Sequence, residues 1–223
     1  MVGVGRFSIL DELYLFPMWK LVQRKQNKRT AESQVEEAGI GLSLTAFIGT
    51  ANLFFTGLVI LNLNDLPKIV QLPVVYLVVS AVAFILSSVI YANISGMHRQ
   101  SALRSSMMRV ADWISEYPGV YLFLIAIPLV LLGVTTTMIV QITTAVACYG
   151  GLLLYSASPF SLDDRRFGKG TSRGLNTAFL AVFTIGIYIL AITDSPYLLP
   201  CGITGLAVLL LLSFVGITFR VKK

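Results

Sequence analysis

The sequence predicts an all-α integral membrane protein with six transmembrane helices arranged as three hairpins. Of its 223 residues, 56% are hydrophobic and only 13% are charged, which is too little polar surface for a water-soluble domain of this size. Several apolar runs are close to the ~20 residues that a helix needs to cross a hydrocarbon layer of ~30 Å. We place the six spans at about residues 40–63, 70–93, 119–134, 138–157, 175–192 and 198–219, so that residues 40–223 form one membrane domain.

The stretch 119–157 decides the topology, because it contains no Asp, Glu, Lys, Arg or His. At ~1.5 Å per helical residue it is almost twice as long as one crossing requires, so it is either one overlong helix or two spans joined by a tight turn. A single crossing would put Arg104 and Arg166, which lie before and after it, on opposite sides of the membrane. Cytoplasmic loops attract Lys and Arg, so we predict two spans with a turn at 135–137.

The basic residues gather in the segments that flank the expected spans. Of the 17 Lys and Arg, 16 fall before residue 40, between 96 and 118, between 158 and 173, or after 219, and only Lys68 lies elsewhere. This distribution predicts a multi-pass protein of the cell membrane with both termini in the cytoplasm. The basic residues, which give a net charge of +6, would then meet anionic lipid headgroups, and we expect no nucleic-acid partner.

Residues 1–39 precede the membrane domain and divide at Pro17. The first part, FSILDELYLFPMWKLV, is too short and too polar to span, and it suits a helix that lies at the membrane interface. The second part, QRKQNKRTAESQVEEAG, predicts a charged cytoplasmic helix that ends at Gly39. A solvated charged face is the simpler interpretation of this helix, and a docking helix for a partner is the alternative.

One face of the first span carries a stripe of small and polar residues. Its members recur at i, i+4, i+7 and i+11 and are Thr45, Gly49, Asn52 and Thr56. The stripe is either a helix-packing seam or one wall of a polar pathway. The fourth span adds Gln141 and Thr144 on one face. An unpaired amide in hydrocarbon costs on the order of several kcal/mol, so we expect Gln141 to bond to another helix.

Residues 97–116, MHRQSALRSSMMRVADWISE, predict an amphipathic helix that lies on the cytoplasmic surface and is ended by Pro118. Its expected polar face consists of Arg104, Ser105, Arg109, Asp112 and Glu116. This loop and the loop near residue 165 would form a cluster on the cytoplasmic side, which consists of His98, Arg99, Asp163, Asp164, Arg165 and Arg166. Ordinary interfacial charge is the simpler interpretation of this cluster.

The sequence offers little for catalysis or for metal binding. No Asp, Glu, Lys, Arg or His lies within the hydrocarbon part of an expected span, which argues against proton-coupled transport and against a retinal pigment. The single histidine, and the cysteines Cys148 and Cys201 without any CxxC, support neither a metal site nor a disulfide. We therefore assign no catalytic residue, no metal and no cofactor.

One part of the chain resembles the UbiA family of intramembrane prenyltransferases. The triplet YAN, which ends at Asn93, closes the second span, and a surface helix, a hairpin and LLLYSASPF at 152–160 follow. The resemblance covers about residues 70–175 and implies a fold like that of the family, which binds Mg²⁺ and a prenyl diphosphate through an Asn-x-x-x-Asp-x-x-x-Asp motif. Here Met97 and Ser101 stand where the two aspartates belong, so the resemblance implies a catalytically inactive relative.

We expect a non-catalytic membrane protein that serves as a subunit of a membrane complex or as a homo-oligomer. Small residues on several spans suit close approach of helices. The polar faces of the first and fourth spans would line a conduit with a channel or transport role, and these faces contain Thr45, Asn52, Thr56, Gln141 and Thr144. The alternative is an enzyme that acts on lipid at the cytoplasmic face.

Overall fold

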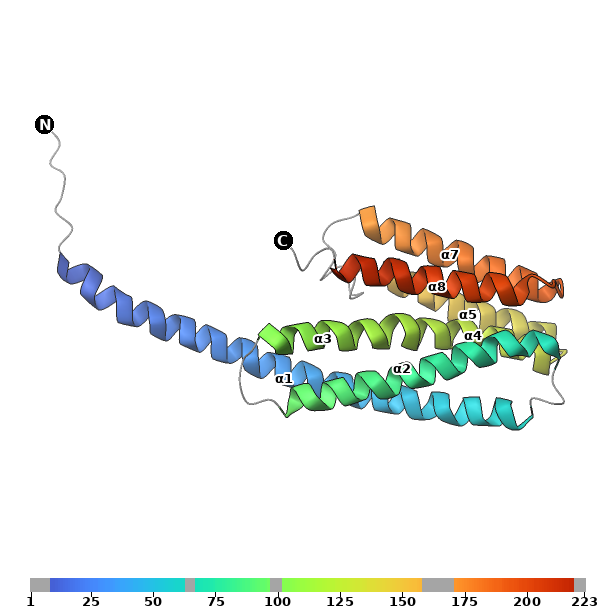
Figure 1. The fold of residues 1–223 in the computed structure, drawn as a ribbon, viewed down its shortest axis with the longest axis horizontal. Coiled ribbons are helices and arrows are strands. Elements are labelled where there is room, and N and C mark those ends of the chain that lie inside the picture. The colour runs from blue at the N-terminus through green and yellow to red at the C-terminus, as the bar shows by residue number, and fades with distance from the viewer. Residues whose placement is uncertain (1–8, 63–66, 97–101, 158–170, 219–223) are drawn as a thin grey trace, which may run out of the picture.

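The computed structural model describes residues 9–62, 67–96, 102–157 and 171–218, and every regular element in these ranges is helical (Figure 1). The prediction of an all-α chain is therefore confirmed. The elements are α1 (Ile9–Leu61), the 3₁₀ turn η2 (Lys68–Val70), α2 (Gln71–Ser95), α3 (Ala102–Ile114), the π-helical segment η3 (Ser115–Tyr121), α4 (Leu122–Val134), α5 (Met138–Ala157), α7 (Thr171–Ile192) and α8 (Leu198–Thr218).

Six apolar helical stretches follow one another along the described chain. By length and composition alone, three of them could cross a membrane, and these are Val35–Leu61, Lys68–Ser95 and Ser106–Val134. Three shorter apolar helical stretches are Met138–Leu154, Thr177–Ile192 and Leu198–Leu211. The six stretches overlap the six predicted spans in sequence, whereas the number of membrane crossings stays a prediction.

The uncharged stretch 119–157 folds as an antiparallel helical hairpin. α4 ends at Val134, Thr135 has an extended backbone with φ −117° and ψ 140°, and α5 begins at Met138. The predicted turn at 135–137 is therefore confirmed. α7 and α8 form a second antiparallel pair, and in their connection Asp194 has a φ of 48°.

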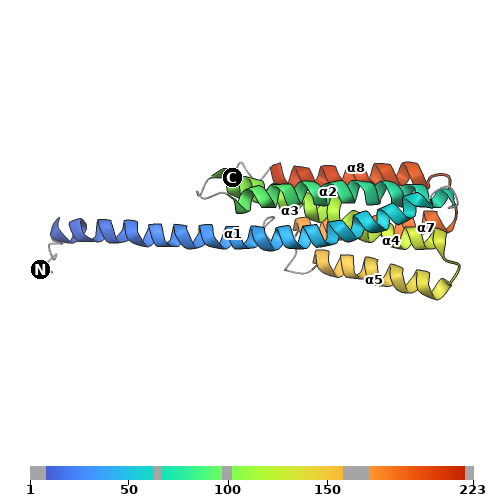
Figure 2. The same ribbon diagram turned by 90° about the horizontal axis from the view of Figure 1, so that it is seen from below.

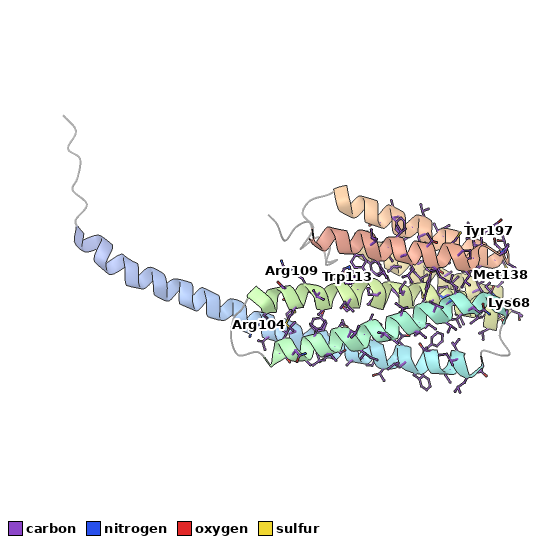
Figure 3. All side chains as sticks on the ribbon, viewed as in Figure 1. Lys68, Arg104, Arg109, Trp113, Met138 and Tyr197 are labelled. Carbon is purple, nitrogen blue, oxygen red and sulfur yellow. The ribbon has the colours of Figure 1, made fainter. Side chains whose placement is uncertain are left out.

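The bundle has two distinct ends (Figures 1 and 2). At one, α2, α5 and α8 end while α3 and α7 begin, and we call it the basic end because the basic segments of the sequence adjoin these termini. At the other, which we call the turn end, α1, α4 and α7 end. Figure 3 places Arg104 and Arg109 at the basic end, and Lys68, Met138 and Tyr197 at the turn end.

α1 is one continuous helix of 53 residues, about 80 Å long at ~1.5 Å per residue. The predicted division at Pro17 and the predicted helix end at Gly39 are therefore both wrong. The first half of α1 extends beyond the basic end of the bundle (Figure 1). A glycine inside a helix costs only about 1 kcal/mol relative to alanine, and burial of the neighbouring Ala38 against Tyr91 favours continuing the helix.

The prediction of a separate surface helix is wrong, because α3, η3 and α4 continue as one long helix along α2. Pro118 does not end this helix but lies inside η3. In an α-helix the proline ring would meet the carbonyl group of Ile114 and would remove one backbone donor. The wider π-helical turn accommodates the ring, and π-helical turns occur often at functional sites.

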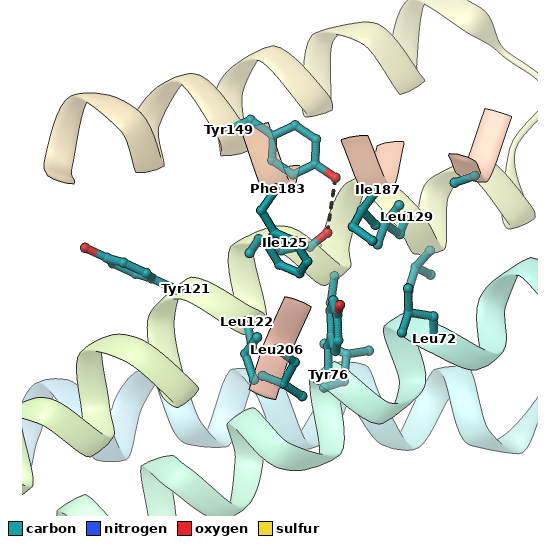
Figure 4. Packing of buried hydrophobic residues seen from close by; sticks show 14 of the residues in the cluster. Leu72, Tyr76, Tyr121, Leu122, Ile125, Leu129, Tyr149, Phe183, Ile187 and Leu206 are labelled. Atoms are coloured by element: carbon teal, nitrogen blue, oxygen red, sulfur yellow. Dashed lines mark hydrogen bonds between the residues drawn. The ribbon is translucent and has the colours of Figure 1, made fainter. Parts of the chain in front are cut away.

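The core of the bundle is formed mainly by α2 and α4, with α5, α7 and α8 packed around them (Figure 4). Leu72, Leu122, Ile125 and Leu129 are almost completely buried there. The Tyr149 hydroxyl group, on α5, donates a hydrogen bond of 3.3 Å to the carbonyl oxygen of Ile125 on α4. Aromatic and aliphatic side chains thus fill the space between the helices.

Large apolar side chains also cover the outside of the bundle. Several of them are exposed by two thirds or more of their surface, and examples are Leu61 (83%), Ile139 (77%), Phe47 (76%), Leu154 (75%), Val182 (74%) and Phe54 (71%). Monomeric soluble proteins rarely expose large contiguous apolar areas, and such areas mark contact with a membrane or another protein. This surface is therefore compatible with a membrane protein.

Candidate functional site

A network of buried hydrogen bonds joins α1, α2 and η3 in the middle of the bundle. The Asn52 Nδ2 atom donates to the Ser80 hydroxyl at 3.0 Å and to the carbonyl oxygen of Leu77 at 3.4 Å. Ser80 donates to the carbonyl oxygen of Gly119 at 2.6 Å. Thr56 donates to the Asn52 Oδ1 atom at 3.1 Å. We call these groups the middle network, and both polar ends of the Asn52 amide are satisfied within it.

A second network lies closer to the basic end, and we call it the inner network. Ser88 on α2 donates to the Thr45 hydroxyl at 2.9 Å, and Thr45 donates to the carbonyl oxygen of Gly41, one turn earlier in α1, at 2.8 Å. Tyr91, on the same helix as Ser88, donates a hydrogen bond to the Asp112 carboxylate on α3. The inner network therefore connects α1, α2 and α3.

Three ionisable side chains are buried along α3 and η3, with Arg104 in the first turn of α3 and with Asp112 and Glu116 near the junction of the two elements. Arg104 is 1% exposed, Asp112 6% and Glu116 3%. The Tyr121 hydroxyl group donates to the Glu116 Oε1 atom at 3.3 Å. The prediction that all three side chains lie on a solvent-facing surface is therefore wrong. It assumed an isolated surface helix, whereas α3 packs along α2 with the face that carries Arg104, Met108 and Asp112, and Val110 on the other side is 42% exposed.

A single aromatic ring separates the middle network from the inner network. Phe84 is 1% exposed and lies on α2 between Ser80 and Ser88, one helical turn from each. A Cβ atom built on Gly49 of α1 would lie 2.9 Å from the Phe84 Cβ atom. One built on Gly119 of η3 would lie 3.1 Å from the Phe84 Cε1 atom. The two glycines thus let α1 and η3 close around the ring.

The structure brings together part of the predicted polar stripe. Thr45, Asn52 and Thr56 are all buried against α2, as a helix-packing seam requires. Gln141 has its partner elsewhere: its Nε2 atom donates to the carbonyl oxygen of Thr135 at 2.6 Å. The expectation that Gln141 bonds to another helix is therefore wrong. The extended backbone at the end of α4 leaves this carbonyl within reach of a side chain on the first turns of α5. Thr144 is half-buried on the same helix.

The predicted cytoplasmic cluster lies outside the described residues, since it consists of His98, Arg99, Asp163, Asp164, Arg165 and Arg166. Of the residues behind the UbiA resemblance, Tyr91 belongs to the inner network and Asn93 is exposed at the end of α2. Met97 and Ser101 are not among the described residues.

Within the described ranges, no group of three or more His, Cys, Asp and Glu side chains is placed to hold a metal ion. Cys148 is half-buried and Cys201 is exposed, and both are free thiols. The residues of the two networks and the three buried ionisable side chains support hydrogen bonding and charge pairing.

No protein-family model, curated protein or solved structure matches this chain. The resemblance to UbiA therefore rests on the sequence features alone.

Proposed function

We propose that this chain is a six-span protein of the cell membrane with both termini in the cytoplasm and with a non-catalytic role. In that role it serves as a subunit of a membrane complex or as a homo-oligomer. The lipid bilayer, with anionic headgroups on the cytoplasmic side, is its first partner. Other membrane subunits or further copies of the chain are the second.

The observation that carries this proposal is the division of polar and apolar groups across the bundle. The outer surface presents large apolar side chains such as Phe47 and Ile139. The polar side chains of Asn52 and Ser80 are turned inward and bonded to one another. A bilayer offers no water to satisfy buried polar groups, so helices in lipid satisfy them internally and expose apolar side chains. The inward pair Asn52 and Ser80 and the outward Phe47 and Ile139 fit both halves of this rule.

Cysteine labelling tests the six-span arrangement directly. We expect K68C and D194C to react with a membrane-impermeant maleimide added outside intact cells, since both residues are exposed at the turn end. K28C, R166C and K222C should react only after permeabilisation. Cys148 and Cys201 are first replaced by serine to give a silent background. Labelling of position 166 from outside while position 68 stays protected would overturn the topology.

The mass of the gently extracted complex tests the subunit role. A subunit or homo-oligomer should run above the 24.3 kDa of one chain after its lipid and detergent are accounted for. Native mass spectrometry gives both the number of copies and the identity of any other subunit. A bare monomer in every mild detergent would count against this role.

A polar conduit with a channel or transport role is the sharper form of the proposal. It is favoured by the middle and inner networks, which place hydroxyl and amide groups along one seam between α1 and α2. Gln141 does not contribute to this seam through the hydrogen bond that it makes. Solute or proton flux in liposomes, with N52L as the altered chain, separates a conduit from a scaffold. Unchanged flux in N52L would argue for the scaffold.

An enzyme that acts on lipid at the cytoplasmic face is the second candidate. It is favoured by the burial of Arg104, Asp112 and Glu116 beside the end of α2 that carries YAN, because ionisable groups buried in membrane proteins tend to be functional. Binding of Mg²⁺ together with a prenyl diphosphate by the purified protein, lost in D112N and in E116Q, would support this candidate. Absence of binding would remove it.

A further inference from the structure

Phe84 occupies a special place in the seam between α1, α2 and η3. Ser80 and Ser88 lie four residues before and four residues after it, so all three side chains share one face of α2, and each hydroxyl group lies about 6 Å along the helix from the ring. Ser80 belongs to the middle network and Ser88 to the inner network. The Phe84 side chain therefore lies between the two networks on this face of α2, and the buried Ser87 hydroxyl donates to the Phe84 carbonyl oxygen at 3.1 Å.

Glycines in the neighbouring helices allow close contact with Phe84. Glycine costs about 1 kcal/mol in a helix relative to alanine, yet glycine stands at both positions that meet the Phe84 side chain: Gly49 faces its Cβ atom and Gly119 faces its ring. A methyl group at either position would come closer to Phe84 than normal van der Waals contact allows. The backbone of η3 thus packs directly on the ring, and the backbone of α1 packs on the Phe84 Cβ atom. An apolar constriction of this kind excludes water because it offers no hydrogen bond.

The residues on both sides of the ring indicate which species could move along the seam. α1 carries no charged residue from Thr45 to Thr56, and α2 carries none from Tyr76 to Tyr91. Hydroxyl and amide groups can pass water and protons along hydrogen bonds, but they do not replace the hydration shell of a metal ion as rings of carbonyls or carboxylates do. η3 adds Glu116, whose carboxylate accepts a hydrogen bond from Tyr121.

We propose that Phe84 is the barrier that closes the polar seam of this protein to water and protons. The proposal rests on the membrane-spanning arrangement proposed above. With the ring in place, the middle and inner networks are separate. With the ring removed, water fills the gap and joins them into one hydrogen-bonded path between α1, α2 and η3.

Proton leak through liposomes tests this role. The full chain is reconstituted into phosphatidylcholine and phosphatidylglycerol vesicles that contain a pH-sensitive dye, and a potassium gradient with valinomycin drives proton entry. We expect F84A to leak protons severalfold faster than the wild type. F84L, which keeps an apolar side chain in the gap, should stay close to the wild type.

Phe183 provides the matched control. It is also buried, and a Cβ atom on Gly205 would lie 2.0 Å from its Cε2 atom, but it packs in the apolar contact between α7 and α8. F183A therefore removes the same ring and also leaves a cavity, but this cavity does not join two polar networks. F183A should leak protons no faster than the wild type. Equal leak rates in F84A and F183A would overturn the barrier. If F84A does not insert into vesicles, F84V takes its place with the same expected order of rates.

The topology labels at positions 68 and 194 are read on the same vesicles. If positions 68 and 194 are labelled as the six spans require and F84A leaks protons no faster than the wild type, the barrier is overturned but the six-span arrangement is not. Labelling that contradicts the six spans removes both.

Discussion

The two halves of the bundle hold their helices together in different ways. In the first half, formed by α1, α2 and the long helix α3–η3–α4, side-chain hydrogen bonds cross from one helix to the next, as Asn52 bonds to Ser80 and Ser80 to Gly119. In the second half, formed by α5, α7 and α8, an aromatic ring meets a glycine, as Phe183 meets Gly205. We call them the seam half and the apolar half.

The apolar half also carries a groove on its outer surface. An outward-facing groove of about 430 Å³ lies between α7 and α8, and its lining includes Phe179, Phe183, Tyr197 and Gly205. The buried Thr184 in this half bonds only to the backbone of its own helix, at 2.8 Å from the Leu180 carbonyl oxygen. Hydrogen bonds between helices occur in this half as well, since Ser156 on α5 donates to the Thr177 hydroxyl on α7 at 3.2 Å. The seam half differs in holding a connected series of bonded side chains, from Thr56 through Asn52 to Ser80, and the conduit proposed above would follow this series.

The largest effect should come from removing a ring in the apolar half. We expect F183A to lower the free energy of unfolding by roughly 3–5 kcal/mol, because a buried Phe→Ala change loses apolar contact and leaves a cavity. Unfolding in mixed micelles by increasing SDS measures this. F84A in the seam half should cost a similar amount, since Phe84 is buried as well. A loss below ~1 kcal/mol for F183A would mean that α7 and α8 collapse around the cavity.

Removing one hydroxyl group should distinguish the two halves more clearly. Y91F deletes the donor to the buried Asp112 carboxylate and should cost about 1.5–3 kcal/mol, as expected for a hydrogen bond to a charged group. Y149F in the apolar half deletes a bond of 3.3 Å to a neutral carbonyl, and it should cost about 0.5–1.5 kcal/mol. The same SDS titration compares them. Equal losses would show that the Asp112 carboxylate does not depend on Tyr91.

Glycine replacements test whether close contact holds each half together. G49A and G205A should each cost roughly 1–3 kcal/mol, because the new methyl group would meet the Phe84 Cβ atom in the first case and the Phe183 ring in the second. The matched controls are G57A and G186A, in the same two helix pairs, where a Cβ atom would meet nothing within 4 Å. These should be neutral or stabilise by up to ~1 kcal/mol through helix propensity. A destabilised control would indicate a further helix packed on that face.

Much of the fold could be predicted from the sequence, because the length and periodicity of the apolar runs already determine where helices form. The turn at 135–137 followed from the charges on either side of 119–157. The continuation of the helix through Pro118 could not be predicted, because it depends on a π-helical turn whose Gly119 carbonyl is bonded by Ser80, from another helix.

The candidate site was only partly predictable for the same reason. The spacing of Thr45, Asn52 and Thr56 identified the seam correctly, since residues on one helical face share a neighbour. The burial of Asp112 depends on Tyr91, and that of Glu116 involves Tyr121. Such contacts between ionisable groups and tyrosines leave no periodic signal in a sequence. The role of Phe84 was likewise invisible, because an aromatic residue in an apolar span is the ordinary case.

The smallest expected effect concerns the hydrogen bonds between helices themselves. N52L removes the donor to Ser80 and the acceptor for Thr56, and it should cost about 0.6–1.7 kcal/mol, the range found for polar contacts between membrane helices. T184V in the apolar half removes a bond within one helix and should change stability by less than ~0.5 kcal/mol. The SDS titration resolves this difference when the two variants are measured side by side. If N52L costs no more than T184V, the middle network adds little to packing, and its retention inside an apolar bundle then argues for the conduit rather than the scaffold.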